Sequence, residues 1–507
     1  MSSIVFHHVS FSYDAAPDGI FSGIDFGVSE GWTGVIGPNG AGKTTLLQLA
    51  CGDLKAKRGQ INRPAKSLYC PQRTDEPMNE FEALLDSVEG EAYRIRGKLG
   101  IEDDWLARWN TLSHGERKRA QIGTCLWLQP DLLAVDEPTN HLDREARSLV
   151  SDTLRSFSGI GLLVSHDREL LDELCDHVLF IDPPTALLRS GGYTTAMAEL
   201  HAEADQARQV RTRAARTRRH LERELTTRRE HQRSADRARS KRAISRKDHD
   251  AKEKIDRARV ADGGAGKRLR QLEGRLQQAT ELEASINVTR PEDLGIGIRG
   301  GASSRNALIR LSKGELGLGE HRTLRFPDLI VQPADRIALV GPNGSGKSTL
   351  VRHIVRELTL PEHRVVYIPQ EIVSDESRSI LQSVRSLPSE VRGRTMAWVR
   401  RLGSDPERLI ASELPSPGEV RKLVLARHLA HEPHLIIMDE PTNHMDLPSI
   451  ECVEAALADY AGGLLLVSHD ARFLDALTRI RWEIEATDRQ LQSFILMPGL
   501  WRTRSDS

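Results

Sequence analysis

An internal duplication constrains the fold of this chain more than any other feature of its sequence. Five short motifs occur twice in the same order, and the second copy follows the first by about 303 residues. The pairs are residues 37–44 and 341–348, the Pro-Gln steps ending at Gln72 and Gln370, residues 113–116 and 416–419, residues 135–141 and 438–444, and residues 165–167 and 468–470. An ordered repeat of this kind indicates two copies of one domain.

The first motif has the pattern of a phosphate-binding loop. Residues 37–44 read G-P-N-G-A-G-K-T, and residues 341–348 read G-P-N-G-S-G-K-S. Residues 32–36 predict a strand before the loop and residues 45–50 predict a helix after it, which is the context that such a loop requires. Its glycines let backbone N–H groups face phosphates, and the helix N-terminus adds a positive dipole end. The pattern therefore predicts α/β domains that bind a nucleotide.

Two side chains at the end of this loop have expected roles. Lys43 should reach the terminal phosphates, and Thr44 should bind Mg²⁺. Lys347 and Ser348 should do the same in the second copy.

A pair of carboxylates follows a strand-like apolar run in each copy. Asp136 and Glu137 end one such run, and Asp439 and Glu440 repeat them. Alone, the pair could mark a strand followed by a surface turn. After a phosphate-binding loop, we expect the aspartates to hold the Mg²⁺ shell and the glutamates to orient or deprotonate the attacking water.

A histidine follows the next apolar run in each copy, at His166 and His469. A single histidine in this place would more often be structural. The matched pair favours a sensor of the terminal phosphate.

The sequence Ser-x-Gly-Glu, at Ser113–Glu116 and again at Ser416–Glu419, fits a helix capping box. The simpler interpretation is a well-capped helix. The motif lies 23 residues before Asp136, and this placement favours a helix N-terminus that points at a phosphate.

Between the copies the composition changes. Residues 201–285 contain 24 Lys and Arg, 14 Asp and Glu, and no aromatic residue. Helix-forming residues dominate, and small apolar residues recur at a spacing of three or four. We expect two antiparallel helices near 195–240 and 250–288 with a tip at 241–249. A solvated charged linker is the alternative. The expected seam consists of Met197, Leu200, Ala204, Ala207, Ala214, Leu221, Leu225, Leu269, Leu272, Leu276, Ala279 and Ile286.

The basic insert favours contact with folded RNA. The whole chain has 71 basic and 72 acidic residues, which excludes a uniformly basic nucleic-acid binder but permits a basic insert between acidic domains. Arginine and lysine bind phosphates non-specifically, and without aromatic residues the insert cannot stack single-stranded bases. A soluble coiled-coil face is the alternative. The outward faces should leave free Arg211, Arg213, Arg218, Arg219, Arg228, Arg229, Lys241 and Arg242.

The remaining composition favours a reducing, cytoplasmic location. Five scattered cysteines without a C-x-x-C pair are typical of neither a disulfide framework nor a zinc site. No apolar run is long enough to span a bilayer, and no signal peptide is visible at the N-terminus.

These motifs, in this order, resemble those of ATP-binding cassette ATPases. Two copies in one chain, a charged helical linker and the Glu-Pro-Thr-Asn-His stretches after Asp136 and Asp439 resemble the ABC-F subfamily. The resemblance implies two tandem cassettes of the P-loop NTPase class joined by a long α-helical hairpin, with domains at 1–193, 194–300 and 301–507. It also implies a monomeric, ATP- and Mg²⁺-dependent ATPase.

The resemblance implies a ribosomal partner as well. ABC-F proteins are soluble translation ATPases that bind the ribosomal E site, where the linker extends toward the peptidyl-transferase centre and could meet rRNA and a P-site tRNA. Some members protect ribosomes from antibiotics. The chain is therefore expected to act in antibiotic resistance or translation regulation.

The family implies a head-to-tail sandwich with each ATP between the phosphate-binding loop of one cassette and the Ser-x-Gly-Glu signature of the other. Site one would comprise Tyr13, Gly37, Pro38, Asn39, Gly40, Ala41, Gly42, Lys43, Thr44, Thr45, Gln72, Asp136, Glu137 and His166 with Ser416, Gly418 and Glu419. Site two would comprise Gly341, Pro342, Asn343, Gly344, Ser345, Gly346, Lys347, Ser348, Thr349, Gln370, Asp439, Glu440 and His469 with Ser113, Gly115 and Glu116. Gln72 and Gln370 would complete the Mg²⁺ ligands.

Two departures from the family pattern distinguish the sites. Pro417 replaces a glycine of the signature, which removes one N–H donor and should slow site one. Tyr13 could stack on adenine in site one, whereas the repeat offset places Gly317 at that position in site two.

Two other classes of function compete with this hypothesis. A soluble ATP-hydrolysing subunit of a transporter can also be a fused pair of cassettes, but it has no use for a long basic hairpin. DNA-repair and chromosome ATPases usually carry much longer coiled coils or zinc-binding cysteines.

Overall fold

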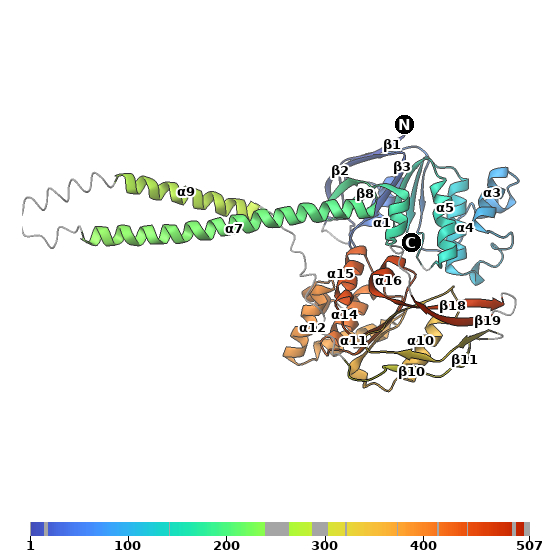
Figure 1. Ribbon diagram of the computed structural model, residues 1–507. Helices are drawn as coiled ribbons and strands as arrows, with labels where there is room; N and C mark the ends of the chain where they lie inside the picture. Colours follow the sequence, from blue (N-terminus) through green and yellow to red (C-terminus); the bar gives the residue numbers. More distant parts are fainter. Residues whose placement is uncertain are drawn as a thin grey trace, which may run out of the picture. The chain divides into compact units, whose positions relative to one another are not determined.

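The computed structural model describes most of the chain and divides it into two compact units (Figure 1). One unit joins Met1–Ala196 to Glu292–Ser507, and the other is Met197–Pro291, which lies inside the expected linker. In the described part of the chain no helix is long and apolar enough to cross a membrane. The described residues are 2–14, 19–140, 142–238, 263–285, 303–319, 322–372, 374–412, 415–443, 445–488 and 493–500.

The first copy contains two sheets. A three-stranded antiparallel sheet has the order β2-β1-β4 and comprises β1 (Ser3–Phe11), β2 (Phe21–Ser29) and β4 (Arg58–Asn62). A six-stranded sheet has the order β5-β6-β7-β3-β8-β9. Its strands are β3 (Gly31–Ile36), β5 (Ser67–Cys70), β6 (Leu132–Asp136), β7 (Ile160–Val164), β8 (Cys175–Asp182) and β9 (Thr185–Ser190).

Helices accompany these strands as the sequence predicts. Every residue of β6 and β7 is buried, as is typical of parallel strands covered on both faces. The helices of this copy are α1 (Lys43–Cys51), α2 (Phe81–Asp86), α3 (Gly90–Leu99), α4 (His114–Trp127), α5 (Arg144–Arg155) and α6 (Arg168–Leu174).

The second copy repeats the plan with a larger mixed sheet. Eight strands have the order β11-β12-β19-β18-β14-β17-β16-β15, and β10 pairs with β13 in a separate ribbon. The central run from β18 to β15 is parallel. The strands are β10 (Ile309–Leu311), β11 (Gly314–Gly317), β12 (Thr323–Phe326), β13 (Leu329–Val331), β14 (Arg336–Val340), β15 (Val365–Ile368), β16 (Leu435–Asp439), β17 (Gly463–Val467), β18 (Ile480–Asp488) and β19 (Ser493–Leu500).

Two cores cover the faces of this sheet. One packs Leu350 and Ile354 of α10 against strand residues such as Leu465. The other packs Leu381 and Leu423, from two further helices, against the opposite face. Figure 1 shows α11, α12 and α14 grouped together in this copy. The helices are α10 (Lys347–Arg356), α11 (Ser374–Arg385), α12 (Ser389–Arg401), α13 (Pro406–Ala411), α14 (Pro417–Leu429), α15 (Leu447–Ala458) and α16 (Ala471–Leu477).

In the described residues of the linker unit, α7 (Tyr193–Ala238) and α9 (Gly263–Ser285) lie side by side (Figure 1). Arg218 pairs with Glu283 and Arg229 with Glu273, so the helices run antiparallel, which confirms the prediction for the described residues. Their shared apolar cluster comprises Leu221, Leu225, Leu272, Leu276 and Ala279. The predicted tip at 241–249, with Lys241 and Arg242, and the seam residue Ile286 lie outside the described residues.

Three of the arginines expected on the outward faces form ion pairs, although Arg228 and Arg229 remain exposed and only Arg218 is half-buried. Arg218 and Arg229 reach the opposite helix through the ion pairs above, because a long side chain beside the seam can cross it. Arg228 pairs along its own helix with Glu224 at 2.6 Å. Arg211, Arg213 and Arg219 are exposed as expected.

Candidate nucleotide sites

The parallel strands bring the repeated motifs to one edge of each sheet. In the first copy the phosphate-binding loop follows β3, Gln72 follows β5, Asp136 ends β6 and His166 follows β7. These strands are neighbours in the sheet, and their carboxyl ends share an edge. Ligands of open α/β sheets bind at this edge.

The backbone of each phosphate-binding loop is tightly fixed. Gly42 has a φ of 92°, and a Cβ atom there would lie 2.5 Å from Ile20 Cγ2. Gly346 has a φ of 95°, and its Cβ would lie 2.6 Å from Leu318 Cδ2. Only glycine fits both requirements. The loop can therefore wrap closely around a ligand, as a phosphate cradle must.

The loop lysines lie at the start of their helices, with Lys43 buried and Lys347 half-buried. Lys43 Nζ donates to the carbonyl oxygens of Gly37 at 2.8 Å and Pro38 at 3.1 Å. In the second copy Lys347 makes the same two bonds, to Gly341 and Pro342. Each ammonium is thereby held inside its loop.

In each copy, two of the three expected Mg²⁺ ligands are joined by a hydrogen bond. Thr44 Oγ1 donates to Asp136 Oδ2 at 2.7 Å, and Tyr69 donates to the same oxygen at 3.1 Å. Ser348 hydrogen-bonds Asp439 in the second copy. Asp439 Oδ1 is buried without a hydrogen-bond partner among the described residues. Hydroxyl and carboxylate oxygens suit Mg²⁺, so these residues fit the ion.

A glutamate and a histidine contact each other in both copies. Glu137 Oε1 lies 3.0 Å from His166 Nε2, and Glu440 Oε1 lies 3.4 Å from His469 Nε2. Glu137 and Glu440 have φ angles of 47° and 49°, a left-handed conformation that non-glycine residues rarely adopt. Strain of this kind persists where surrounding structure holds it and concentrates at functional sites.

Burial keeps these glutamate–histidine pairs close to neutral. It raises the pKa of Glu137 to about 8, with the adjacent Asp136 adding to the effect, and it raises the pKa of Glu440 to about 8. Burial, assisted by the nearby loop lysine, lowers the pKa of His166 to about 3 and that of His469 to about 4. Each histidine is therefore neutral at physiological pH, and each carboxyl can exchange a proton there.

The signature motifs begin helices, as predicted. Ser113 caps α4 by accepting from Glu116 N at 3.3 Å, while Glu116 Oε2 accepts from Ser113 N at 2.7 Å. Ser416 and Glu419 form the same capping box on α14. Pro417 is the first residue of α14, a position where proline is tolerated.

The two copies meet at these motifs. Asn343 of the second loop lines a cavity of about 520 Å³ together with Ser113, Gly115 and Glu116 of the first signature. On the other side, Asn39 N of the first loop donates to Asp446 Oδ2 at 2.7 Å. The structure thus brings each loop to the other copy and places the second loop beside the first signature.

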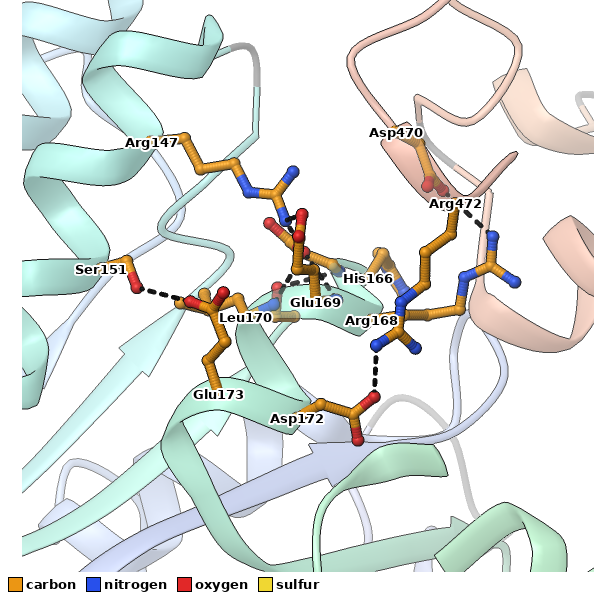
Figure 2. Close-up of polar contacts among 12 residues, drawn as sticks. Arg147, Ser151, His166, Arg168, Glu169, Leu170, Asp172, Glu173, Asp470 and Arg472 are labelled. Carbon is orange, nitrogen blue, oxygen red and sulfur yellow. Dashed lines mark hydrogen bonds and ion pairs between the residues drawn. The ribbon is translucent and has the colours of Figure 1, made fainter. Parts of the chain in front are cut away.

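Two arginines form ion pairs between the copies that the sequence did not predict (Figure 2). Arg168, only 8% exposed, pairs with Glu454 at 2.9 Å and Asp470 at 3.4 Å. Arg472 pairs with Asp172 at 2.6 Å. Arg168 directly follows the first His-Asp motif, and Arg472 lies two residues after the second. These positions alone do not indicate which residues the arginines contact.

The start of α7 also contacts the second copy. Tyr193 Oη donates to Glu451 Oε1 at 2.6 Å, and Arg472 Nη1 donates to Thr194 Oγ1 at 3.0 Å. The first turn of the linker helix is therefore attached to α15 and α16 of the second copy.

The residues at the expected adenine positions differ between the two copies. Tyr13 is 42% exposed, and its hydroxyl lies 3.0 Å from Thr45 Oγ1 beside the first loop. Gly317 ends β11 and presents no side chain. Instead Leu318 and Arg322 line a cavity of about 350 Å³ that also contains the second loop, Gln370, Asp439 and His469. Arg322 could not be found from the repeat, because the loop that carries it differs in length between the copies.

A family model described as ABC transporter matches residues 21–140 and 324–443, which are corresponding parts of the two copies. The helical unit lies between the two matches.

Similar proteins cover nearly the whole chain. The ribosome protection protein VmlR of Bacillus subtilis is 27% identical over 92% of this chain and 84% of its own length. The tylosin resistance ATP-binding protein TlrC of Streptomyces fradiae is 29% identical over 95% of this chain and 97% of its own. In fold, the chain resembles the archaeal ribosome recycling factor aABCE1 solved with stalk protein aP1. The TM-score is 0.64 at 18% identity, and the match covers 98% of this chain and 90% of the other. The duplicated cassettes and these relatives show that the chain belongs to the ABC-F subfamily of ATP-binding cassette proteins.

Proposed function

We propose that this protein is a ribosome-binding ATPase that couples ATP binding and hydrolysis to insertion and release of its linker. It would occupy the ribosomal E site, extend the linker toward the peptidyl-transferase centre, and protect ribosomes from antibiotics or regulate translation. The single observation that carries the ATPase part is the cavity shared by the second phosphate-binding loop and the first signature. A site built from both cassettes is complete only when the cassettes meet.

Each residue of the proposed sites has a role that follows from its chemistry. The loop N–H groups and Lys43 or Lys347 bind the phosphates. Thr44, Gln72 and Asp136, or Ser348, Gln370 and Asp439, would hold Mg²⁺, which would offset phosphate charge when bound. Glu137 and Glu440 orient the attacking water and accept its proton. The contacts with His166 and His469 hold these carboxyls in place.

The ribosomal part rests on the relatives and on the linker. Proteins similar over most of the chain are named for ribosome protection and for resistance to tylosin. The linker presents Arg211, Arg213 and Arg219 at its surface, where they can contact RNA phosphates.

Trapping the closed state tests the proposal. The Glu137→Gln/Glu440→Gln double variant should bind ATP, fail to hydrolyse it, and sediment with 70S particles when ATP is present. The control adds Lys43→Ala and Lys347→Ala, which remove phosphate contacts, and should stay in the supernatant. Co-purification with integral membrane proteins and no sedimentation with ribosomes would instead support a transporter subunit.

A further inference from the structure

A buried cation lies on the signature helix of the first cassette. Lys118 of α4 is 0% exposed. Its Nζ donates to the carbonyl oxygens of Pro71 at 2.6 Å and Asp136 at 2.9 Å. Pro71 directly precedes Gln72, and the Asp136 carbonyl belongs to the peptide bond that joins Asp136 to Glu137. One ammonium therefore connects the signature helix to both segments that carry catalytic candidates.

The second cassette has an arginine at the matching position. Arg421 is five residues after Ser416, just as Lys118 is five residues after Ser113. Arg421 is 2% exposed, and its guanidinium donates to the carbonyl oxygens of Gln370, Asn443 and, at 3.2 Å, Glu440. Two chemically different cations thus hold the same two segments, and the fork of the arginine reaches a third.

The burial of these two cations costs free energy, and it also places their donors where they can hold the backbone of the nucleotide site. Burying a cation costs several kcal/mol unless its donors are satisfied, and the acceptors recorded for both cations are backbone carbonyls in the loops around the nucleotide site. Glu137 and Glu440 adopt the left-handed conformation there. A strained backbone keeps such a conformation only when neighbours over-determine it. Lys118 holds the carbonyl group of Asp136, just before the strained Glu137, and Arg421 holds the carbonyl group of the strained Glu440 itself.

We propose that Lys118 and Arg421 are positioning residues for ATP hydrolysis in their own cassettes. They hold the glutamine loop and the catalytic glutamate at a fixed distance from the signature helix. They touch backbone and not nucleotide, so they act through Gln72, Glu137, Gln370 and Glu440. The inference rests on the proposed ATPase function and extends it to residues outside the five repeated motifs.

The inference predicts a loss of turnover without a loss of nucleotide affinity. Lys118→Met keeps the length of the side chain and removes its donors. In a Glu440→Gln background, where site one alone turns over, we expect Lys118→Met to lower kcat by about tenfold or more, because 1.4 kcal/mol of lost positioning is tenfold in rate. The Kd for a fluorescent ATP analogue should change less than about twofold. Lys118→Arg should restore most of the turnover.

The second cassette offers a matched control on one helix. Lys422, next to Arg421, is also a buried cation, but the partners recorded for it include Gly403 O and Ser449 Oγ, away from the glutamine loop. In a Glu137→Gln background, Arg421→Met should lower kcat and Arg421→Lys should recover it. Lys422→Met should lower thermal stability to a similar extent and leave kcat near that of its parent.

Hydrogen exchange gives a readout independent of activity. Lys118→Met should speed amide exchange in residues 70–73 and 136–138 and leave the loop at 37–44 unchanged. A folded Lys118→Met protein with parental kcat and exchange would overturn the inference, as would equal losses of kcat in Arg421→Met and Lys422→Met. Absence of ATPase activity in the unmodified protein would instead reject the proposed function itself.

Discussion

At the scale of single residues, the two nucleotide sites are alike in their carboxylates and different at their edges. Both glutamates share the left-handed backbone and the histidine contact. Pro417 and Arg322 of the second copy, in contrast, have no equivalent in the first. His114 occupies the position that corresponds to Pro417, and a loop of different length precedes Phe21 where Arg322 would be expected. The sites should therefore differ in rate and in nucleotide contacts, not in mechanism.

Site one should turn over more slowly than site two. The expected site one faces the N-terminus of α14, where Pro417 removes one N–H donor. A donor at a helix N-terminus contributes about 0.5–1 kcal/mol, which corresponds to a rate difference of about 2–5-fold. Glu440→Gln, which leaves site one active, should thus keep a lower residual ATPase rate than Glu137→Gln. Equal residual rates in steady-state assays would contradict this prediction.

Arg322 should contribute to nucleotide binding in site two. It lines the cavity beside the second loop, and a guanidinium can bind phosphate or stack on a base. Arg322→Ala should weaken binding of a fluorescent ATP analogue at that site by about 3–10-fold. Arg325→Ala is the control, because Arg325 is exposed and pairs with Glu315. Equal affinities of the two variants would show that Arg322 has no such role.

At the scale of elements, the sequence predicted those helices and strands that are determined by the spacing of apolar residues or by a motif with a fixed structural context. Strand β3, helix α1 and the antiparallel pair α7 and α9 follow from apolar spacing and from a motif with a fixed structural context. The roles of Lys118 and Arg168 could not be predicted in this way. Their partners are 47 and 286 residues away, and nothing local marks a cation that will be buried by tertiary packing.

The same distinction applies to the linker arginines. A seam predicts which residues face inward, but it does not predict which long side chains beside the seam reach across it. Arg218 and Arg229 do so, and Arg229 is nevertheless exposed, as are Arg211, Arg213 and Arg219.

Ribosome binding should depend on the exposed arginines. Changing Arg211, Arg213 and Arg219 together to Glu should reduce co-sedimentation with 70S particles by about tenfold or more at moderate salt, because phosphate contacts dominate such affinity. The triple change to Lys keeps the charge and should retain most of the binding. Unchanged sedimentation of the glutamate variant, with normal helix content by circular dichroism, would exclude these three arginines as RNA contacts.

At the scale of the whole molecule, the contacts between the cassettes include ion pairs that are partly buried. Arg168 is the most enclosed of them and pairs with two carboxylates of the second cassette. Removing one partner from such a group typically costs about 3–5 kcal/mol, because the opposite charges remain uncompensated. Association of the cassettes should be sensitive to this one side chain.

Arg168→Met should favour separation of the cassettes. We expect faster hydrogen exchange in α15 and α16 and a weaker ATP-dependent compaction in small-angle scattering. Arg155→Met is the control, since Arg155 is exposed and pairs with Asp152 and Glu173 of its own cassette. Identical scattering of both variants with ATP would show that the Arg168 contacts do not hold the cassettes together.

The attachment of Tyr193 to Glu451 has a mechanical consequence. Tyr193 is the first residue of α7, which continues for 46 residues, about 70 Å at 1.5 Å per residue. A helix that is attached at its base to the second cassette and continuous in sequence with the first can act as a lever. Tilting that base by about 5° would move its far end by about 6 Å, so a small rotation at the base would become a displacement about as wide as an amino-acid residue at the other end of the helix.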